Sequence, residues 1–303
     1  MSTTTSPTSA GHDPAVADAA PSPGASRQPR LRWWVEMLTI IVCYELYSLA
    51  RNTQGSRSVS ADVAFRNARA LLRLEHHIGL GWERPVQRVF LHAEPLVKGL
   101  NIFYGSAHFI VTVGVLVWLF FRQSHRYRMW RWALATTTLL ALIGFTAFPL
   151  MPPRLLPVEE RAQALVATHP GLGHDAASRQ ALVEVRGGTY RSAKYPYDDT
   201  LETIGGLWNF ESGAIAKLSN QYAAMPSLHF AWSMWCACAL VPGLRRRGAK
   251  ALAIAHPVLT GTAIVATANH YVLDAVAGAA TLAIGIALAH LFVGGHLRRP
   301  TRR

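Results

Sequence analysis

Two histidines and a carboxylate stand beside apolar segments in a spacing that can support nucleophilic chemistry. His270 and Asp274 are four residues apart, so one face of a helix would carry both side chains. A carboxylate that holds an imidazole orients it as a nucleophile. His229, which follows residues 226–228 at the start of an apolar segment, can donate a proton to a leaving oxygen. Together these side chains could displace a group at phosphorus through a phosphohistidine.

An arginine could hold the phosphoryl group during such a reaction. Arg154 comes directly after Pro152 and Pro153, at the end of another apolar segment, and a guanidinium can bind a phosphoryl group through two parallel hydrogen bonds. The helical turn that opens at Pro226 and Ser227 adds free backbone amides, which attract anions. Such a site needs no metal or other cofactor, because arginine and helix amides supply the positive charge.

Structural roles are the alternative for the same residues. His270 and Asp274 could form a helix-stabilising pair in a membrane turn, and His229 could be a histidine satisfied within the core. Tyr104 and His108 lie on one face of a further apolar segment and could simply form interhelical hydrogen bonds. Ionisable residues within membrane segments are rare and generally functional, which favours the catalytic interpretation of the two histidines.

The composition indicates that these residues belong to a membrane protein. Of the 303 residues, 50% are hydrophobic and only 16% are charged, whereas a soluble domain carries about 25% charged residues. The net charge of +13 comes mainly from arginines scattered over the loops, which favours anionic lipid over nucleic acid as a partner. The 3 cysteines lie within apolar runs and form no Cys-x-x-Cys pair, which argues against a disulfide framework and a thiolate zinc site.

The apolar runs predict six membrane-spanning helices, since a bilayer core needs about 20 mostly apolar helical residues. The predicted spans are Trp33–Ala50, Leu100–Phe121, Trp132–Leu150, Pro226–Val241, Ala251–Ala268 and Ala275–Val293. Arginine-rich clusters beside alternate ends of these spans fall on one side, which the positive-inside rule assigns to the cytoplasm together with both termini. We therefore expect a multi-pass protein of the cell membrane whose candidate residues lie on the extracytoplasmic side.

Two long connections would cover that side. The first contains Ala64–Leu80, whose apolar residues recur at helical spacing among arginines, and predicts an amphipathic helix in the membrane interface with its cationic face toward lipid phosphates. The second, residues 155–222, contains Arg191 and Lys194 among aromatic residues and predicts an extracytoplasmic loop cap that binds the headgroup. The expected fold class is all-α, a polytopic six-helix membrane bundle. Its expected parts are a disordered tail (1–30), the membrane domain (31–296) and a basic cytoplasmic tail (297–303).

Two short motifs resemble those of a known family. Pro-Ser-Leu-His at 226–229 and His-x-x-x-Asp at 270–274 are similar to the second and third motifs of the type 2 phosphatidic acid phosphatase superfamily. Its members are six-helix membrane enzymes that act on lipid phosphates and diphosphates. The resemblance extends over roughly residues 40–290.

One branch of that superfamily resembles this chain more closely. The runs 224–232 and 269–274 are similar to those of its inositol phosphorylceramide synthase-like branch. Met-Pro-Pro-Arg at 151–154 stands where that branch carries a proline-rich first motif, and Tyr104 and His108 also look like a feature of the branch. This resemblance favours transfer of a phosphoryl-linked group over simple hydrolysis.

The resemblance implies a role for each central residue. His270 would be the nucleophile, Asp274 its orienting partner, and His229 the acid that protonates the departing alkoxide or phosphate. The chain departs from the superfamily's pattern because it lacks the Lys-x6-Arg-Pro first motif and has Ala263-Ile264 where a Ser-Arg pair usually stands. Other groups must then bind the phosphate and the rest of the substrate. The candidates are Arg154, Arg51, Ser227, Tyr104, His108, Arg191 and Lys194.

These expectations describe an integral membrane lipid-phosphate phosphatase or phosphotransferase that works through a phosphohistidine. The substrate would be a membrane lipid phosphate or a polyprenyl phosphate or diphosphate. Water as the acceptor gives a phosphatase, and inositol or another alcohol gives a phosphotransferase. One alternative is an enzyme that processes prenyl diphosphates on the same site, as a diphosphatase or terpene cyclase. Another is a non-enzymatic lipid transporter, although the sequence lacks the related halves that are typical of transporters.

Overall fold

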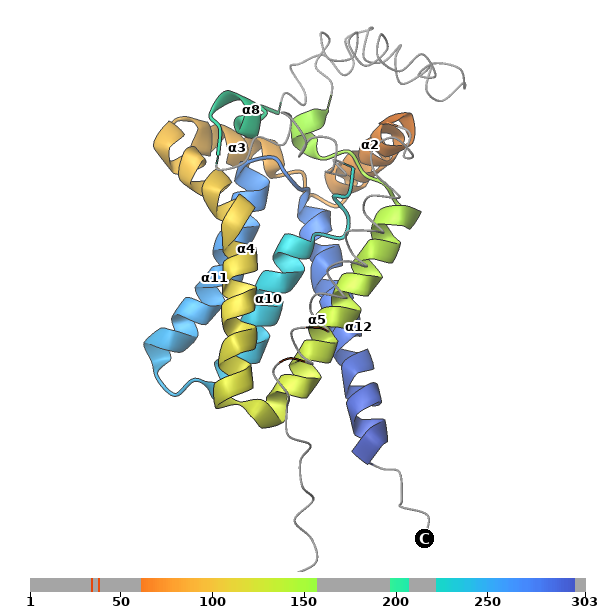
Figure 1. Ribbon diagram of the computed structural model, residues 1–303. Coiled ribbons are helices and arrows are strands. Elements are labelled where there is room, and N and C mark those ends of the chain that lie inside the picture. Colours follow the sequence, from red (N-terminus) through yellow and green to blue (C-terminus); the bar gives the residue numbers. More distant parts are fainter. Residues whose placement is uncertain (1–33, 35–37, 39–60, 157–196, 207–221, 298–303) are drawn as a thin grey trace, which may run out of the picture.

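Figure 1 shows the computed structural model, which describes residues 34, 38, 61–156, 197–206 and 222–297. Over these residues the protein is helical and contains no β-strand, which confirms the expected all-α class. Five helices run side by side as a bundle, and three further helices lie at one end of it (Figure 1). The bundle helices are α4 (Glu94–Arg122), α5 (Ser124–Ala147), α10 (Leu228–Leu240), α11 (Arg247–Ala266) and α12 (Val272–Leu297). The end is covered by α2 (Ala61–His77), α3 (Glu83–Leu91) and α8 (Thr200–Thr203), and short 3-10 turns occur at Pro153–Leu155 and Val241–Gly243.

Three of the bundle helices are long and apolar enough to cross a bilayer. They are α4, α11 and the Val272–Val293 part of α12, and they coincide with the predicted second, fifth and sixth spans. The predicted third and fourth spans coincide with α5 and α10, but α10 has only 13 residues, fewer than the roughly 20 that a full crossing needs. The predicted first span lies outside the described residues except for Trp34 and Leu38, so the total of six spans stays a prediction.

The short helix α10 forms the centre of the bundle. It packs against α4, α5, α11 and α12, and its Trp235 is fully buried among side chains of α4, α5 and α12. The indole Nε1 of Trp235 donates a hydrogen bond to the carbonyl oxygen of Trp130 on α5, at 2.9 Å. Because neighbouring helices surround α10, its first turn is held in a fixed place at the covered end of the bundle.

Glycines on α12 allow two of these helices to approach closely. A Cβ on Gly278 would collide with the backbone carbonyl of Ser227, and one on Gly285 would collide with the Thr137 hydroxyl and lie 3.2 Å from the Ala133 carbonyl oxygen. The carbonyl oxygen of Gly285 in turn accepts a hydrogen bond from Thr136, at 3.0 Å. Small residues at such crossings are how helices pack in membranes.

We expect Gly285→Ala to lower stability by about 1–3 kcal/mol, because the added methyl group must push α5 away from α12. Gly114→Ala is the matched control, since a Cβ on Gly114 meets nothing within 4 Å, and it should be neutral or stabilising by up to about 1 kcal/mol. The apparent melting temperatures of the two variants in detergent measure the difference. Equal shifts would contradict the close packing of α5 and α12.

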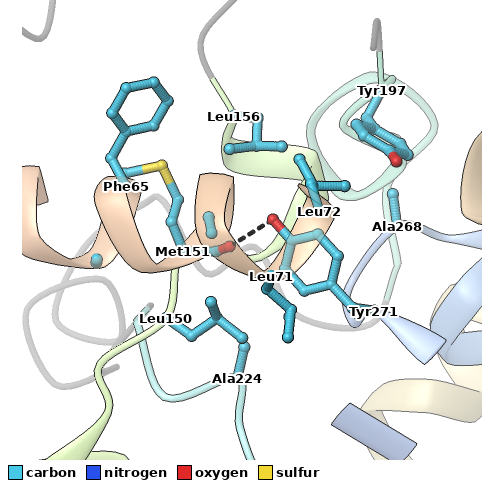
Figure 2. Packing of buried hydrophobic residues seen from close by; sticks show 12 residues of the cluster. Phe65, Leu71, Leu72, Leu150, Met151, Leu156, Tyr197, Ala224, Ala268 and Tyr271 are labelled. Carbon is cyan, nitrogen blue, oxygen red and sulfur yellow. Dashed lines mark hydrogen bonds between the residues drawn. The ribbon is translucent and has the colours of Figure 1, made fainter. Parts of the chain in front are cut away.

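Helix α2 lies at the end of the bundle (Figure 1), and its apolar residues pack against other parts of the protein there (Figure 2). The sequence predicted a helix over 64–80, and the structure has one at Ala61–His77. Its Phe65 and Leu72 are 5% and 4% exposed and pack into a cluster with Met151 and Tyr271. The apolar face therefore contacts the protein itself, and the expected place of this helix in the membrane interface stays a prediction. Periodicity revealed the face but not its partner.

Candidate active site

Backbone hydrogen bonds join the three sequence segments that carry the candidate residues. The amide of Leu150 donates to the carbonyl oxygen of Tyr222 at 2.8 Å, and the amide of Arg154 donates to that of Ala268 at 2.9 Å. The amide of Ser227 donates to the carbonyl oxygen of Asp274, also at 2.9 Å. Figure 2 shows that the Tyr271 hydroxyl adds a hydrogen bond to the Met151 carbonyl oxygen, at 2.9 Å. The segments converge at the covered end of the bundle.

His270 and Asp274 form a buried pair at the start of α12. The imidazole Nδ1 lies 3.2 Å from Asp274 Oδ2, and the two residues are 4% and 0% exposed. The same carboxylate oxygen accepts a hydrogen bond from the amide of Tyr271 at 3.0 Å, which fixes its position. The imidazole Nε2 has no hydrogen-bond partner among the described residues. With Nδ1–H donated to the carboxylate, Nε2 carries the free lone pair of the ring.

A tight turn between α11 and α12 places His270. The amides of Asn269 and His270 both donate to the carbonyl oxygen of Ile264, at 2.9 and 3.1 Å, and so satisfy the end of α11. Ala268 has a positive φ of 52°, a conformation that non-glycine residues adopt at a cost. His270 therefore precedes the first helical residue of α12, Val272. The spacing of four residues therefore brings the pair together across a turn. The sequence had suggested that both side chains lie on one face of a helix.

His229 lies on the first turn of α10, within a group of aromatic rings. Its ring centroid is 4.2 Å from that of Tyr104, in a stacked arrangement, and 4.2 Å from that of His108. The His270 ring centroid is 5.5 Å away. Nδ1 of His108 lies 3.0 Å from the carbonyl oxygen of Tyr104, to which it donates. The structure thus brings together the two histidines and both predicted residues of α4.

Arg154 is held by an ion pair that the sequence did not predict. Its Nη1 donates to Asp199 Oδ2 at 2.8 Å, and the two side chains are 6% and 0% exposed. Oδ1 of Asp199 accepts the amides of Leu201 and Glu202 at 3.1 and 3.3 Å, so the same carboxylate also caps α8. A carboxylate fixed in this way fixes the guanidinium in turn.

Two side-chain amides attach the segment around α8 to the bundle. Gln87 of α3 donates to the carbonyl oxygen of Asp198 at 2.8 Å and accepts its amide at 3.0 Å. Asn101 of α4 donates to the carbonyl oxygens of Thr200 and Gly205 at 2.9 and 2.8 Å. Asn101 stands three residues before Tyr104, so one face of α4 supports both α8 and the ring group. In the sequence, the spacing of three residues between Asn101 and Tyr104 indicates that the two side chains share one face of the helix.

The family model described as the PAP2 superfamily matches residues 69–288. The chain belongs to the PAP2 superfamily. A comparison with curated proteins and another with solved structures found no match. The matched range includes His229, His270, Asp274 and Arg154.

Membership confirms the superfamily that the sequence resembles, whose members are phosphatases and phosphotransferases. The apolar helices agree with a protein of the membrane. The inositol phosphorylceramide synthase-like branch stays a prediction, because the match extends to the superfamily alone.

The structure places only one of the remaining substrate-binding candidates of this PAP2 protein, Ser227. The Ser227 side chain is fully buried, and its hydroxyl accepts the amide of Phe230 at 3.4 Å as the cap of α10. This contact gives Ser227 a structural task at the start of the helix that carries His229. Arg51, Arg191 and Lys194 lie outside the described residues, as does most of the loop predicted to form a cap.

Proposed function

We propose that this PAP2 protein is an integral membrane lipid-phosphate phosphatase or phosphotransferase that works through a phosphohistidine. One observation carries the proposal: Nδ1 of His270 is bound to Asp274, while Nε2 has no partner among the described residues and the His229 ring stands 5.5 Å away, centroid to centroid. An oriented nucleophile and a nearby acid are the two groups that displacement at phosphorus requires. Arg154, anchored by Asp199, supplies a cation to the same end of the bundle.

The reaction has two balanced steps. The Nε2 lone pair of His270 attacks phosphorus, the bond from phosphorus to the leaving oxygen breaks, and His229 gives that oxygen a proton. The acceptor then attacks the phosphohistidine, the nitrogen–phosphorus bond breaks, and His229 takes the acceptor's proton. Water as acceptor releases phosphate, whereas inositol or another alcohol forms a new phosphoester. Asp274 stabilises the positive charge that develops on the His270 ring.

The proposed site faces the extracytoplasmic side, with both termini in the cytoplasm. The arginine clusters within 122–131 and 245–250 lie at the end of the bundle opposite α2, α3 and α8 (Figure 1). Positive charge of this kind marks the cytoplasmic side of membrane proteins. The candidate residues, at the other end, would therefore meet lipid headgroups of the outer leaflet.

The experiment is a substrate panel with the detergent-purified full-length protein. Phosphatidate, polyprenyl phosphate and polyprenyl diphosphate are assayed for release of inorganic phosphate, and labelled inositol is assayed for transfer into lipid with phosphatidylinositol and ceramide present. We expect release or transfer with at least one of these lipids, and we expect its loss in His229→Ala. His125→Ala, which changes an exposed histidine at the start of α5, is the control. Full activity of His229→Ala would overturn the assigned acid.

A further inference from the structure

Two glutamates outside the proposed catalytic set are completely buried. Glu75 in the last turn of α2 and Glu83 at the start of α3 are both 0% exposed. Glutamate is almost never fully buried unless it is paired, and an unpaired buried carboxylate is costly. Neither residue forms part of the motifs at 226–229 or 270–274. The contacts of the two carboxyl groups should therefore show why they are buried.

Both carboxyl groups bind the beginning of α12. Oε1 of Glu83 accepts the amide of Val272, and Oε1 of Glu75 accepts the amide of Leu273, each at 2.8 Å. The preceding amide, that of Tyr271, donates to Asp274. Three consecutive amides thus each donate a hydrogen bond to a different carboxyl group. The first amides of a helix lack acceptors within the helix. Here the acceptors come from residues 189 and 198 positions away in the sequence.

The surroundings of the two carboxyl groups favour their protonated forms. Burial, together with the neighbouring Glu83 carboxyl, raises the pKa of Glu75 from its ordinary value of 4.5 to about 9, and the negative charge of Asp274 adds to this. Burial also raises the pKa of Glu83, with a smaller contribution from Asp274. A hydrogen bond between the two side chains also raises the pKa of Glu75 and lowers that of Glu83. Retaining a proton reduces the negative charge beside Asp274, where an anionic substrate must approach His270.

We propose that Glu75 and Glu83 are positioning residues, a carboxyl bracket that fixes the first turn of α12 and thereby the orientation of the His270–Asp274 pair. The bracket holds Val272 and Leu273, the two residues between Tyr271 and Asp274. A shift of this turn would move the imidazole relative to His229. The catalytic consequence rests on the proposed function, whereas the ordering of α12 does not.

Two kinds of substitution separate the ability of the bracket to accept the helix amides from its ability to ionise. Glu75→Gln and Glu83→Gln keep an oxygen that accepts the helix amide but cannot ionise. Glu75→Leu and Glu83→Leu remove the acceptor. Glu94→Gln, at an exposed position at the start of α4, is the control. In the leucine variants we expect kcat to fall on the order of 10- to 100-fold with little change in KM, because the turn is displaced. Ionisation of the pair near pH 9 would add negative charge beside Asp274, so we expect the rate of the unsubstituted protein to decline there. In the glutamine variants we expect a smaller loss at neutral pH and no such decline.

Stability gives a second pH readout. The folded pair binds its proton more tightly than the unfolded chain, so the stability that this proton contributes is complete below pH 4.5 and is lost as the pH rises through about 9. The apparent melting temperature of the unsubstituted protein should therefore fall over that interval. The fall should be smaller in the Glu75→Gln, Glu83→Gln double variant.

Amide hydrogen exchange of peptides covering 271–274, in the full-length protein, tests the bracket without any substrate. We expect exchange about 10-fold faster in the leucine variants than in the unsubstituted protein, since the amides lose their acceptors. Unchanged exchange in the leucine variants, or a pH profile of the glutamine variants that matches the unsubstituted protein, would overturn the proposal. If the leucine variants fail to fold, the pH dependences of the rate and of the melting temperature in the glutamine variants decide it. Faster exchange together with no turnover of any lipid by the unsubstituted protein would support the bracket and reject the proposed function.

Discussion

His270→Gln is expected to lower the rate of phosphate release or transfer by a factor on the order of 10³ or more while the protein stays folded. The reason is that the substitution removes the Nε2 lone pair that attacks phosphorus. The neighbouring imidazole, that of His229, has its ring centroid 5.5 Å away and cannot attack from the same position. Initial rates with the best lipid of the panel measure the effect. The melting temperature of the variant serves as the check on folding.

A trapping experiment tests the intermediate itself. Phosphohistidine is labile to acid and stable to base, so rapid quenching in alkali after reaction with a ³²P-labelled lipid should leave label on the unsubstituted protein and none on His270→Gln. Label that persists on the variant would assign the nucleophile to another residue.

Asp274→Asn should also be severely impaired, by about 10²- to 10⁴-fold, because an amide at this position favours the wrong tautomer of the imidazole. The double variant His270→Gln, Asp274→Asn should be no slower than His270→Gln alone, since the carboxylate acts through the imidazole. Additive losses would mean that Asp274 has a separate task.

The sequence predicted that the central residues of the candidate site lie together, because their spacing is encoded locally. The spacing of His270 and Asp274 brought an imidazole and a carboxylate to 3.2 Å, and the position of His229 at the start of an apolar segment placed it at the same end of the bundle. Ends of apolar segments that fall on one side of a membrane share that surface and can meet there. The family match extends over the same segments.

The supporting residues could not be found in the same way. Glu75 and Glu83 contact α12 across 198 and 189 residues, and no period or short motif records a partner at that distance. In the sequence they are two glutamates in an arginine-rich connection, which an exposed helix would equally contain. Helix α2 shows the same limit, because its periodicity predicted a helix with an apolar face but did not indicate that this face packs against Met151 and Tyr271.

Arg154→Ala is expected to lower kcat/KM by a factor on the order of 10² to 10³, through loss of the cation that would hold the phosphoryl oxygens. Arg154→Lys should recover only part of this, because an ammonium group keeps the charge but cannot bind two oxygens in a plane. Steady-state kinetics of both variants with the best lipid measure the effect. Equal activity of Arg154→Ala and the unsubstituted protein would move phosphate binding to other cations, such as Arg51, Arg191 or Lys194.

Asp199 determines whether Arg154 is held ready for the substrate. The carboxylate is bound at once by Arg154 Nη1 and by two amides of α8, so its position does not depend on the guanidinium. Asp199→Ala leaves a buried cation without this partner, which typically costs about 3–5 kcal/mol, and it also removes the cap of α8. We expect a lower melting temperature together with a raised KM.

Asp199→Asn separates these two effects, because its amide oxygen can still accept the α8 amides. Asp198→Asn is the matched control, since the adjacent aspartate is exposed. If Asp199 acts on catalysis by orienting Arg154, adding Asp199→Asn to Arg154→Ala should lower kcat/KM no further. A further loss in the double variant would show that Asp199 contributes to the reaction independently of the arginine, and α8 would then belong to the substrate site itself.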